Sequence, residues 1–406
     1  MRRLPLVALL AAVGLSACGS VMTMLAVPWF VLATTGSAAK TGLTAGAEVV
    51  GTVVAALLAG PMVDRFGRRA VSVASDLVAA AVVAMIPLLH ATVGLPFGAL
   101  IALAVALGMA SAPGTTARKS MMPGLIALTG VGGERAASGY DGVARGAWML
   151  GSPLAGVLIA VLGPQSVLLV DAATFLASAA LVRLFVPLVG GDAEPESGGY
   201  LTRLRRGMAY VRGDRLMLWI VVMVSVTNLL DAAFYAVLMP VFAQDVLHSS
   251  IALGVMSGVF SSAALAGSLT FAVVGPRLPR RLTFALAFLL SGAPRFVVLA
   301  LGTPLPLVLA LFAVLGLGVG AINPLLGVTQ YERVPESVLP MVVGVMYAGA
   351  YCGMPLGAAL AGLSVEALGL TPTLWTAATL YLAITLAPLL APTWREMDNR
   401  KTLVRA

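Results

Sequence analysis

The sequence is poor in the residues that build soluble catalytic sites. Only 10% of its 406 residues are charged, while 60% are hydrophobic, which leaves too little polar surface to cover a soluble core. The only histidines, His90 and His248, fall at predicted loops, and no Cys-x-x-Cys or His-rich cluster occurs. Neither a metal site nor a nucleophile with its base is indicated. We therefore expect no enzyme, no metal and no cofactor.

The two cysteines are also too few for a disulfide framework, because Cys18 and Cys352 both fall in predicted helices. Cys18 ends a string, Leu15-Ser16-Ala17-Cys18, that resembles a lipoprotein cleavage site after Arg2-Arg3 and an apolar run. That run continues to Phe30 and is too long for the core of a signal peptide. We predict an uncleaved first helix.

Twelve apolar stretches are each long enough to cross a bilayer. About 20 apolar residues in a helix span the hydrocarbon core, and a helix satisfies its own backbone hydrogen bonds there. The sequence therefore predicts an all-α integral membrane protein with twelve transmembrane helices. They are placed at 5–33, 42–62, 70–90, 96–117, 136–162, 166–188, 217–243, 250–273, 282–301, 305–329, 339–366 and 372–391.

Basic residues outside the predicted helices fall on alternate loops. They cluster at the termini and after even-numbered helices, as at 65–69, 203–215 and 277–281, whereas the opposite loops hold only Lys40. Positively charged loops stay in the cytoplasm and attract anionic headgroups. We predict that both termini are cytoplasmic. The net charge of +8 then indicates membrane lipids, including anionic inner-leaflet lipids, and no nucleic acid.

A polar segment, 190–199, interrupts the chain near its middle and precedes a basic stretch that runs to Arg215. This stretch is either an amphipathic helix on the inner leaflet or a solvated basic helix. The predicted domains are an N-terminal six-helix bundle (1–189), a cytoplasmic linker (190–216), a C-terminal six-helix bundle (217–392) and a cytoplasmic tail (393–406).

Matching strings at corresponding places indicate that the two halves are diverged copies. Repeated halves around a central pathway are the architecture of alternating-access transporters. The matches are Gly60-Pro61 with Arg68-Arg69 against Gly275-Pro276 with Arg280-Arg281, and the string 146–154 against 349–356.

The loop after the second predicted helix resembles a signature of the major facilitator superfamily. Residues 60–69 read Gly-Pro-Met-Val-Asp-Arg-Phe-Gly-Arg-Arg and match it in place, type and spacing. The resemblance implies a two-bundle, pseudo-symmetric fold in which Asp64 locks one state by meeting the cytoplasmic start of the helix at 339–366, near Glu336, Ser337 and Pro340. An ordinary acidic turn residue is the alternative for Asp64.

From the residues themselves, Gly60 is expected to allow close helix packing and Gly67 a tight turn. The paired arginines of the loop are expected to meet lipid phosphates. The predicted gate consists of Gly60, Asp64, Arg65, Gly67, Arg68, Arg69, Asp76 and Arg118.

A second resemblance, to proton-driven drug exporters of the macrolide-efflux and actinobacterial Tap type, runs along most of the chain. It is carried by residues 26–29, 75–77, 116–123, 279–281 and 342–346. The exporters' Gly-Pro appears as Ser152-Pro153, and Pro340-Met341 stands where Gly-Arg is frequent. The resemblance implies a multi-pass protein of the bacterial inner membrane. Its signature in the helix at 136–162 comprises Gly151, Pro153 and Gly156.

Ionisable residues inside predicted spans are costly and therefore candidates for function. Asp141 and Arg145 stand four apart and are expected to neutralise each other. Asp76 is expected to pair with Arg118 or Arg69, as part of the gate or as plain structure. Asp171 is placed near the outer end of its helix, where it can reach the interface, and Arg295 is expected to snorkel, with anion binding as the alternative.

Glu48 and Asp231 differ from these because no basic residue stands one turn away in the sequence. We predict that both carry protons during transport; the alternative is a neutral, hydrogen-bonded carboxyl at a helix contact.

The sequence also has few groups that could replace the hydration of a polar substrate, with three Asn and three Gln in all. Apolar and aromatic walls suit a small amphiphilic substrate, and carboxylates among aromatics favour cations. Packing alone is the alternative role for each aromatic residue. The predicted cavity residues are Met22, Trp29, Asn228, Phe234, Tyr235, Tyr347 and Tyr351.

Together these features predict a monomeric, proton-coupled exporter of lipophilic cationic drugs or natural products that works by alternating access. No Gly-x-x-x-x-Gly-Lys loop is present, so ATP is not the expected direct energy source. Two alternatives stay open. One is a narrow exporter of an endogenous metabolite such as a siderophore or self-made antibiotic, and the other is a non-transporting receptor or scaffold on the same fold.

Overall fold

The computed structural model describes residues 3–188, 200–335 and 338–398. Regular structure in these residues is helical, and twelve helices among them are long and apolar enough to cross a membrane. The prediction of an all-α membrane protein with twelve spans is confirmed.

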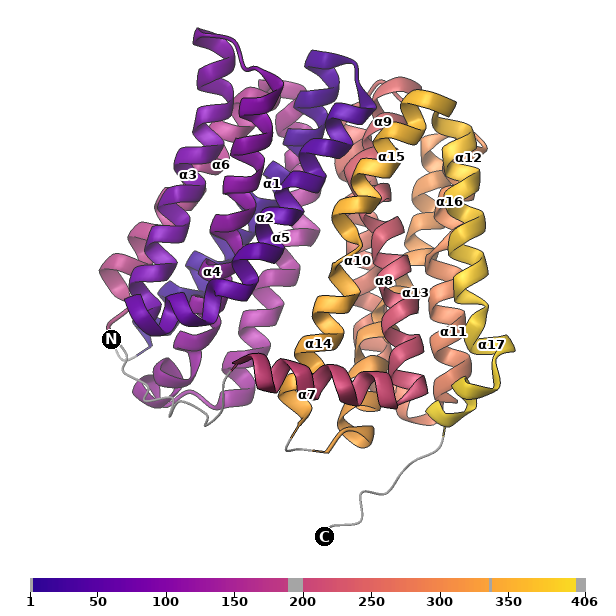
Figure 1. Cartoon of the computed structure of the whole chain (residues 1–406). Helices are drawn as coiled ribbons and strands as arrows, with labels where there is room; N and C mark the ends of the chain where they lie inside the picture. Colours follow the sequence, from indigo (N-terminus) through magenta and orange to yellow (C-terminus); the bar gives the residue numbers. More distant parts are fainter. Residues whose placement is uncertain (1–2, 189–199, 336–337, 399–406) are drawn as a thin grey trace. The chain divides into compact units, whose positions relative to one another are not determined.

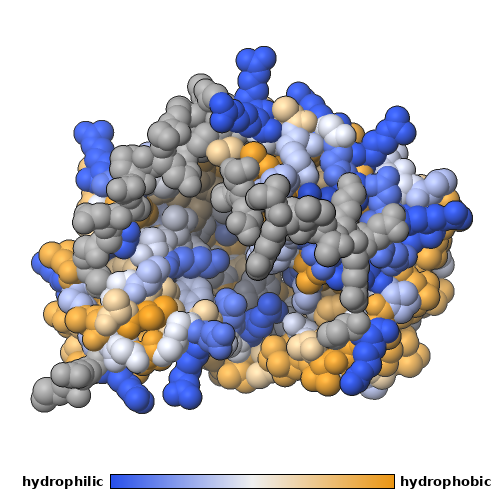
Figure 2. All heavy atoms as spheres, turned by 90° about the horizontal axis from the view of Figure 1, so that it is seen from below, coloured by the Kyte–Doolittle hydropathy of each residue, from blue (hydrophilic) through white to orange (hydrophobic). Residues whose placement is uncertain are grey.

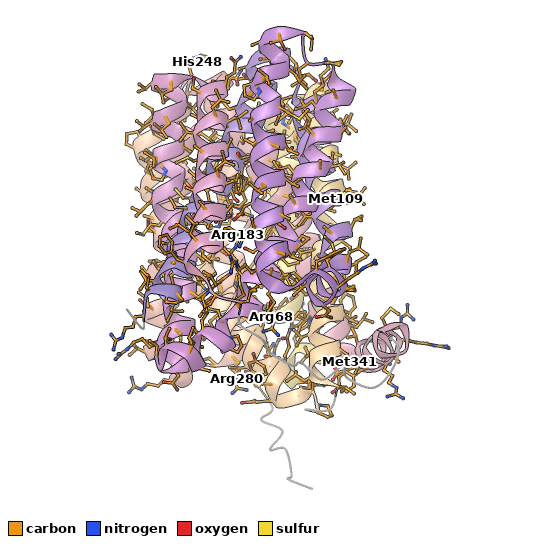
Figure 3. The ribbon with its side chains drawn as sticks, turned by 90° about the vertical axis from the view of Figure 1, so that its left-hand side faces the viewer. Arg68, Met109, Arg183, His248, Arg280 and Met341 are labelled. Atoms are coloured by element: carbon orange, nitrogen blue, oxygen red, sulfur yellow. The ribbon has the colours of Figure 1, made fainter. Side chains whose placement is uncertain are left out.

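The chain forms two compact units, of which the first comprises Met1–Glu194 and Met239–Gly258. Within it α6 packs on α1 and α3, while α4 packs on α2 and α3 (Figure 1). His248 lies at one end of this unit and Arg68 lies toward the other (Figure 3). Its helices include α1 (Leu4–Thr35), α2 (Ala38–Phe66), α3 (Arg68–Thr92), α4 (Phe97–Thr129), α5 (Gly133–Leu162) and α6 (Pro164–Phe185), and α9 (Met239–Val241) and the start of α10 (Ser250–Val274) also belong to it.

Glycines let these helices begin, end and approach one another closely. α1 ends at Gly36, whose φ of +63° favours glycine, and the Ser37 hydroxyl then caps α2 by accepting the Lys40 N–H at 3.1 Å. α2 and α4 nearly touch, because a Cβ on Gly108 would lie 1.9 Å from the Glu48 carbonyl oxygen.

The second unit comprises Pro195–Leu238 and Val259–Ala406. Its helices are α7 (Tyr200–Gly213), α8 (Arg215–Ala233), the larger part of α10 (Ser250–Val274), α11 (Arg280–Ser291), α12 (Ala293–Ala300), α13 (Leu305–Arg333), α14 (Leu339–Tyr351), α15 (Met354–Leu368), α16 (Leu370–Thr385) and α17 (Ala387–Leu390). The seventh span, Arg215–Val246, runs from α8 through α9 (Met239–Val241) and two π-helical turns, Phe234–Leu238 and Phe242–Val246.

α7 occupies the second part of the predicted linker and lies across the ends of other helices of its unit (Figure 1). Gly207 packs against α14, and the Tyr210 hydroxyl donates to the Arg333 carbonyl at 2.8 Å. The Arg333 guanidinium in turn binds Asp214, at 2.5 Å, and Glu396. Hydrophilic residues gather on this face (Figure 2). Residues 190–199 of the predicted linker lie outside the described residues, and the domain boundaries stay a prediction.

Candidate functional site

A cavity of about 450 Å³ lies within the second unit. Its wall combines α8, α10, α11, α13, α14 and α16 with the start of α12. Of the predicted cavity residues, Asn228, Tyr235, Tyr347 and Tyr351 line it. Phe234 is buried behind the wall instead, and Met22 and Trp29 belong to the first unit.

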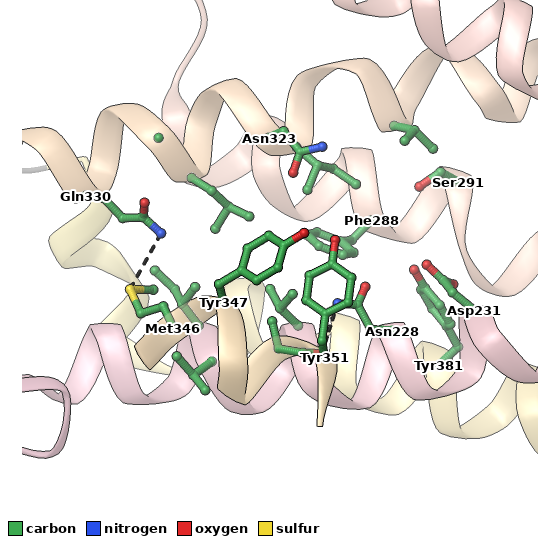
Figure 4. A pocket seen from close by; sticks show the side chains of 18 of the residues that line it. Asn228, Asp231, Phe288, Ser291, Asn323, Gln330, Met346, Tyr347, Tyr351 and Tyr381 are labelled. Carbon is green, nitrogen blue, oxygen red and sulfur yellow. Dashed lines mark hydrogen bonds between the residues drawn. The ribbon is translucent and has the colours of Figure 1, made fainter. Parts of the chain in front are cut away.

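Close packing of α8 on α15 fixes one side of this cavity. A Cβ on Gly357 would lie 1.9 Å from the Leu229 carbonyl oxygen, so only glycine permits this approach. The Asn228 side chain donates to the Ala350 carbonyl at 3.0 Å and holds the end of α14. Tyr347 and Tyr351 then stack with their ring centroids 4.3 Å apart, and both project into the cavity (Figure 4).

The opposite end of the cavity holds an ion pair between Asp231 of α8 and Arg295 of α12. The Asp231 side chain is 32% exposed, whereas that of Arg295 is only 3% exposed. The expectation that Arg295 snorkels to the interface is therefore wrong. Its partner is 64 residues away in the sequence, so no local pattern could reveal the pair.

Aromatic rings surround the buried guanidinium. The Arg295 Cζ lies 4.7 Å from the Phe234 ring centroid, 5.0 Å from that of Phe296 and 5.5 Å from that of Tyr381. These cation–π contacts replace part of the lost hydration. The π-helical turn at Phe234–Leu238 and the break at Gly292 make room for them, because a Cβ on Gly292 would lie 1.7 Å from the Tyr381 ring.

The gate residues of the signature loop are placed at the junction of α2 and α3. Gly67 has a φ of +85°, as a tight turn requires, but a Cβ on Gly60 would meet nothing within 4 Å in the described structure. The expected close packing at Gly60 is therefore wrong. Asp64 is exposed, and the Arg65 guanidinium lies 5.4 Å from the Phe66 ring.

Arg69 of this loop has a contact within the protein, and the predicted partners of Asp64 lie outside the described residues. Arg69 donates to the Arg183 carbonyl at 2.6 Å, at the end of α6, where a lipid phosphate was expected. Arg68 stands at the start of α3. Residues 336 and 337, which include the predicted partners of Asp64, lie outside the described residues. The Asp64 lock stays a prediction.

Asp76 and Arg118 form a buried ion pair inside the first unit. Both carboxylate oxygens of Asp76 lie 2.9 Å from the same guanidinium nitrogen, and the residues are 2% and 7% exposed. Ser178 of α6 donates to Asp76 at 2.7 Å, and Ser16 of α1 lies between the two charges. The pair thus joins four helices, and its predicted role in the gate stays a prediction.

Two other expectations about charged residues are wrong. Asp171 does not reach the interface, because it is fully buried between α6 and α1 and accepts hydrogen bonds from Thr23 and Thr174. Asp141 and Arg145 are both exposed, and no ion pair joins these two described residues. Glu48 is half-buried in α2.

The helix-five signature marks the places where α5 meets its neighbours. Gly151 faces Cys18 and Val21 of α1, and a Cβ on Gly156 would lie 2.6 Å from the Ser250 carbonyl oxygen of α10. Pro153 packs where a Cβ on Gly258 would clash with its ring at 2.3 Å. All three residues therefore serve close helix packing.

Twelve apolar helices and a membrane-embedded cavity with a half-exposed carboxylate define a polytopic membrane transporter. The model of the Major Facilitator Superfamily matches residues 9–276 and 221–403, and the chain belongs to this family. Because the members of this family are transporters, the protein is a transporter and not an enzyme.

Curated relatives match over nearly their whole length. The multidrug efflux pump Tap of Mycobacterium tuberculosis is 32% identical over 404 residues, covering 97% of this chain and 95% of that protein. Tap of Mycolicibacterium fortuitum is 31% identical over 406 residues, covering 98% of each. The crystal structure of the nucleoside transporter NupG has a TM-score of 0.78 at 13% identity, covering 95% of this chain and 98% of that one. The family resemblance drawn from the sequence is confirmed.

Proposed function

We propose that the protein exports lipophilic cations from a bacterial cytoplasm in exchange for protons, by alternating access. The observation that carries this proposal is the asymmetry of the Asp231–Arg295 pair. Both residues line the cavity, but the carboxylate is 32% exposed, whereas the guanidinium is only 3% exposed and lies against aromatic rings. A ligand in the cavity therefore meets a carboxylate and apolar walls.

The remaining wall suits bulky amphiphiles. The stacked rings of Tyr347 and Tyr351 can present a ring face to a cation. The Asn228 amide already donates one hydrogen bond to the Ala350 carbonyl. Ser291, Asn323 and Gln330 also line the cavity, but most of the remaining lining side chains are apolar. Broad acceptance of lipophilic molecules would agree with the name of the Tap relatives, which are multidrug efflux pumps.

Exchange follows if Asp231 holds either a proton or the cationic substrate. A proton on the carboxylate removes the charge that attracts the cation, so binding of one disfavours the other. Glu48 is the second carboxyl that we assign to coupling. We further propose that the protein works as a monomer with cytoplasmic termini, and that its basic loops contact anionic inner-leaflet lipids.

Accumulation of fluorescent lipophilic cations in cells tests this function. Cells that express the protein should accumulate less dye than cells with an empty vector, and a protonophore should abolish the difference. Asp231→Asn and Glu48→Gln should each abolish it as well. Asp245→Asn is the matched control, because Asp245 is exposed and does not line the cavity.

Asp231→Asn leaves the Arg295 charge buried without its partner, so this variant can fail by misfolding. The double variant Asp231→Asn, Arg295→Met removes both charges and should fold without exporting dye. Protonophore-sensitive export by the folded double variant would refute the role of Asp231. Unchanged accumulation across the whole dye panel would instead favour a narrow metabolite exporter or a scaffold.

A further inference from the structure

We infer that Asp171 is a proton-binding carboxyl of the first unit, held at the contact between α1 and α6. The inference rests on the proposed proton coupling and adds a residue that the sequence pattern placed at the interface. It is carried by a carboxyl that is fully buried within the spans and that, among the described residues, has hydroxyl partners and no cation within 4 Å.

The contacts of Asp171 come from one face of α1 and from its own helix. Thr23 donates to one carboxylate oxygen, and Thr174 donates to the other at 3.0 Å. Asp171 is 0% exposed. Within the described part of the chain, no Lys or Arg nitrogen lies within 4 Å of this carboxyl.

Asp76 provides an internal comparison on the same two helices. Ser16 and Thr23 are two turns apart on α1, and Asp171 and Ser178 are two turns apart on α6, so each pair shares one helix face. At the level of Ser16 and Ser178, Asp76 is bound together with the Arg118 guanidinium. At the level of Thr23, no Lys or Arg nitrogen of the described residues binds Asp171. A carboxyl in that position is neutral while it carries a proton and costly when it does not.

Gly19 creates the space for this carboxyl. It lies between Ser16 and Thr23 on α1, and a Cβ there would stand 1.9 Å from an Asp171 carboxylate oxygen and 2.2 Å from the Thr174 hydroxyl oxygen. Any other residue at position 19 would displace the Asp171 carboxylate and the Thr174 hydroxyl. The site is thus formed by the contact between two helices.

The titratable groups that face Asp171 are acidic or neutral. Glu48 of α2, Cys18 of α1 and Asp76 of α3 all interact with it electrostatically. Arg118 already binds Asp76 at 2.9 Å. A negative charge on Glu48 and one on Asp171 repel each other, so a proton on either carboxyl lowers the cost of burying both.

The step itself is a proton transfer. A hydronium ion on the side from which protons enter gives its proton to the Asp171 carboxylate and leaves water, and an O–H bond forms on the carboxyl. On the other side that O–H bond breaks, and water takes up the proton as hydronium. In this structure the carboxyl is fully buried, so each transfer needs a conformation in which water reaches it.

Infrared spectroscopy of the purified protein in lipid vesicles tests the inference directly. The carbonyl stretch of a protonated, buried carboxylic acid should be present at low pH and lost as the pH is raised. Asp171→Asn should remove this band. Gly19→Ala should shift or remove it, whereas Gly14→Ala should not, because a Cβ there meets only a Val143 methyl at 3.0 Å.

Two results would overturn the assignment: a band that does not respond to pH, and a titrating band that survives Asp171→Asn but is lost in Glu48→Gln. The measurement is independent of dye export. A titrating Asp171 in a protein whose export ignores protonophores would refute the proposed coupling alone. Proton-coupled export with a silent Asp171 would refute this inference alone. Size-exclusion profiles identify any variant that fails to fold. If Asp171→Asn fails to fold, Asp171→Glu, which keeps a titratable carboxyl, should shift the band, and an unshifted band would overturn the assignment.

Discussion

The buried pair of Asp76 and Arg118 allows a quantitative test of how the first unit is held together. The perturbation is a double-mutant cycle with Asp76→Asn, Arg118→Met and the double variant. Both residues are nearly inaccessible, and the two charges are 2.9 Å apart. Removal of one member of such a pair costs about 3–5 kcal/mol, because the other charge stays buried without a partner.

The two single variants should not be equal. Arg118→Met leaves Asp76 with hydroxyl donors on Ser16 and Ser178, and a carboxyl can also take up a proton. Asp76→Asn leaves a guanidinium that cannot lose its charge and whose other recorded acceptor is the Ser16 hydroxyl, at 3.2 Å. We expect Asp76→Asn near the upper end of the range and Arg118→Met near the lower end.

The double variant should be more stable than either single variant, since no uncompensated charge remains. The assay is unfolding by SDS in mixed micelles, followed by circular dichroism, with the midpoint and slope compared across the four proteins. A coupling energy of about 2 kcal/mol or more is expected from the range for contacting residues. Costs that simply add would refute the view that these charges stabilise each other.

Three other perturbations test contacts that lie within one unit or the other. Gly156→Ala should cost about 1–3 kcal/mol in the same unfolding assay, because the new Cβ meets the Ser250 carbonyl oxygen at 2.6 Å, whereas Gly146→Ala, with nothing within 4 Å, should cost nothing. Arg333→Ala should loosen the junction between α7 and α8 at Asp214 and speed cleavage of α7 by trypsin; an unchanged rate would show that the ion pairs do not hold this junction. Burial raises the pKa of Tyr210, and the Asp214 carboxylate raises it further. The neutral hydroxyl of Tyr210 therefore stabilises the fold below the ordinary tyrosine pKa of about 10. The wild type should therefore be more stable than Tyr210→Phe below about pH 10, and this difference in the free energy of unfolding should disappear as the pH rises through the raised pKa of folded Tyr210. A difference that persists above that pH would contradict the assignment.

Hydropathy and charge were sufficient to predict the spans, because each is a local property of about 20 consecutive residues. Turn chemistry was also readable, as the φ of +85° at Gly67 shows. The partners of buried charges were not. Arg295 meets Asp231 across 64 residues, and Asp171 is covered by α1 across 148 residues, so the environment of each depends on which helices pack together.

The same limit applies to the glycines. Gly60 and Gly19 look alike in a sequence, yet a Cβ on Gly60 meets nothing within 4 Å and one on Gly19 would clash with a carboxylate. Only the packing of α1 on α6 shows that Gly19, unlike Gly60, makes room for a buried carboxylate.

The two units surround their membrane-embedded carboxylates differently, and the difference indicates which ligand each carboxylate can bind. In the second unit Asp231 has a fixed cationic partner and is exposed to the cavity, so it can exchange ligands while Arg295 stays buried. In the first unit Asp171 is fully buried and, among the described residues, has no cationic partner. A carboxylate of the first kind can hold a bulky cation or a proton, and one of the second kind admits only a proton. If both assignments hold, Asp171→Asn should abolish coupling while a lipophilic cation still binds, and Asp231→Asn, Arg295→Met should abolish cation binding while Asp171 still titrates. Equilibrium dye binding, measured beside the infrared titration, separates the two.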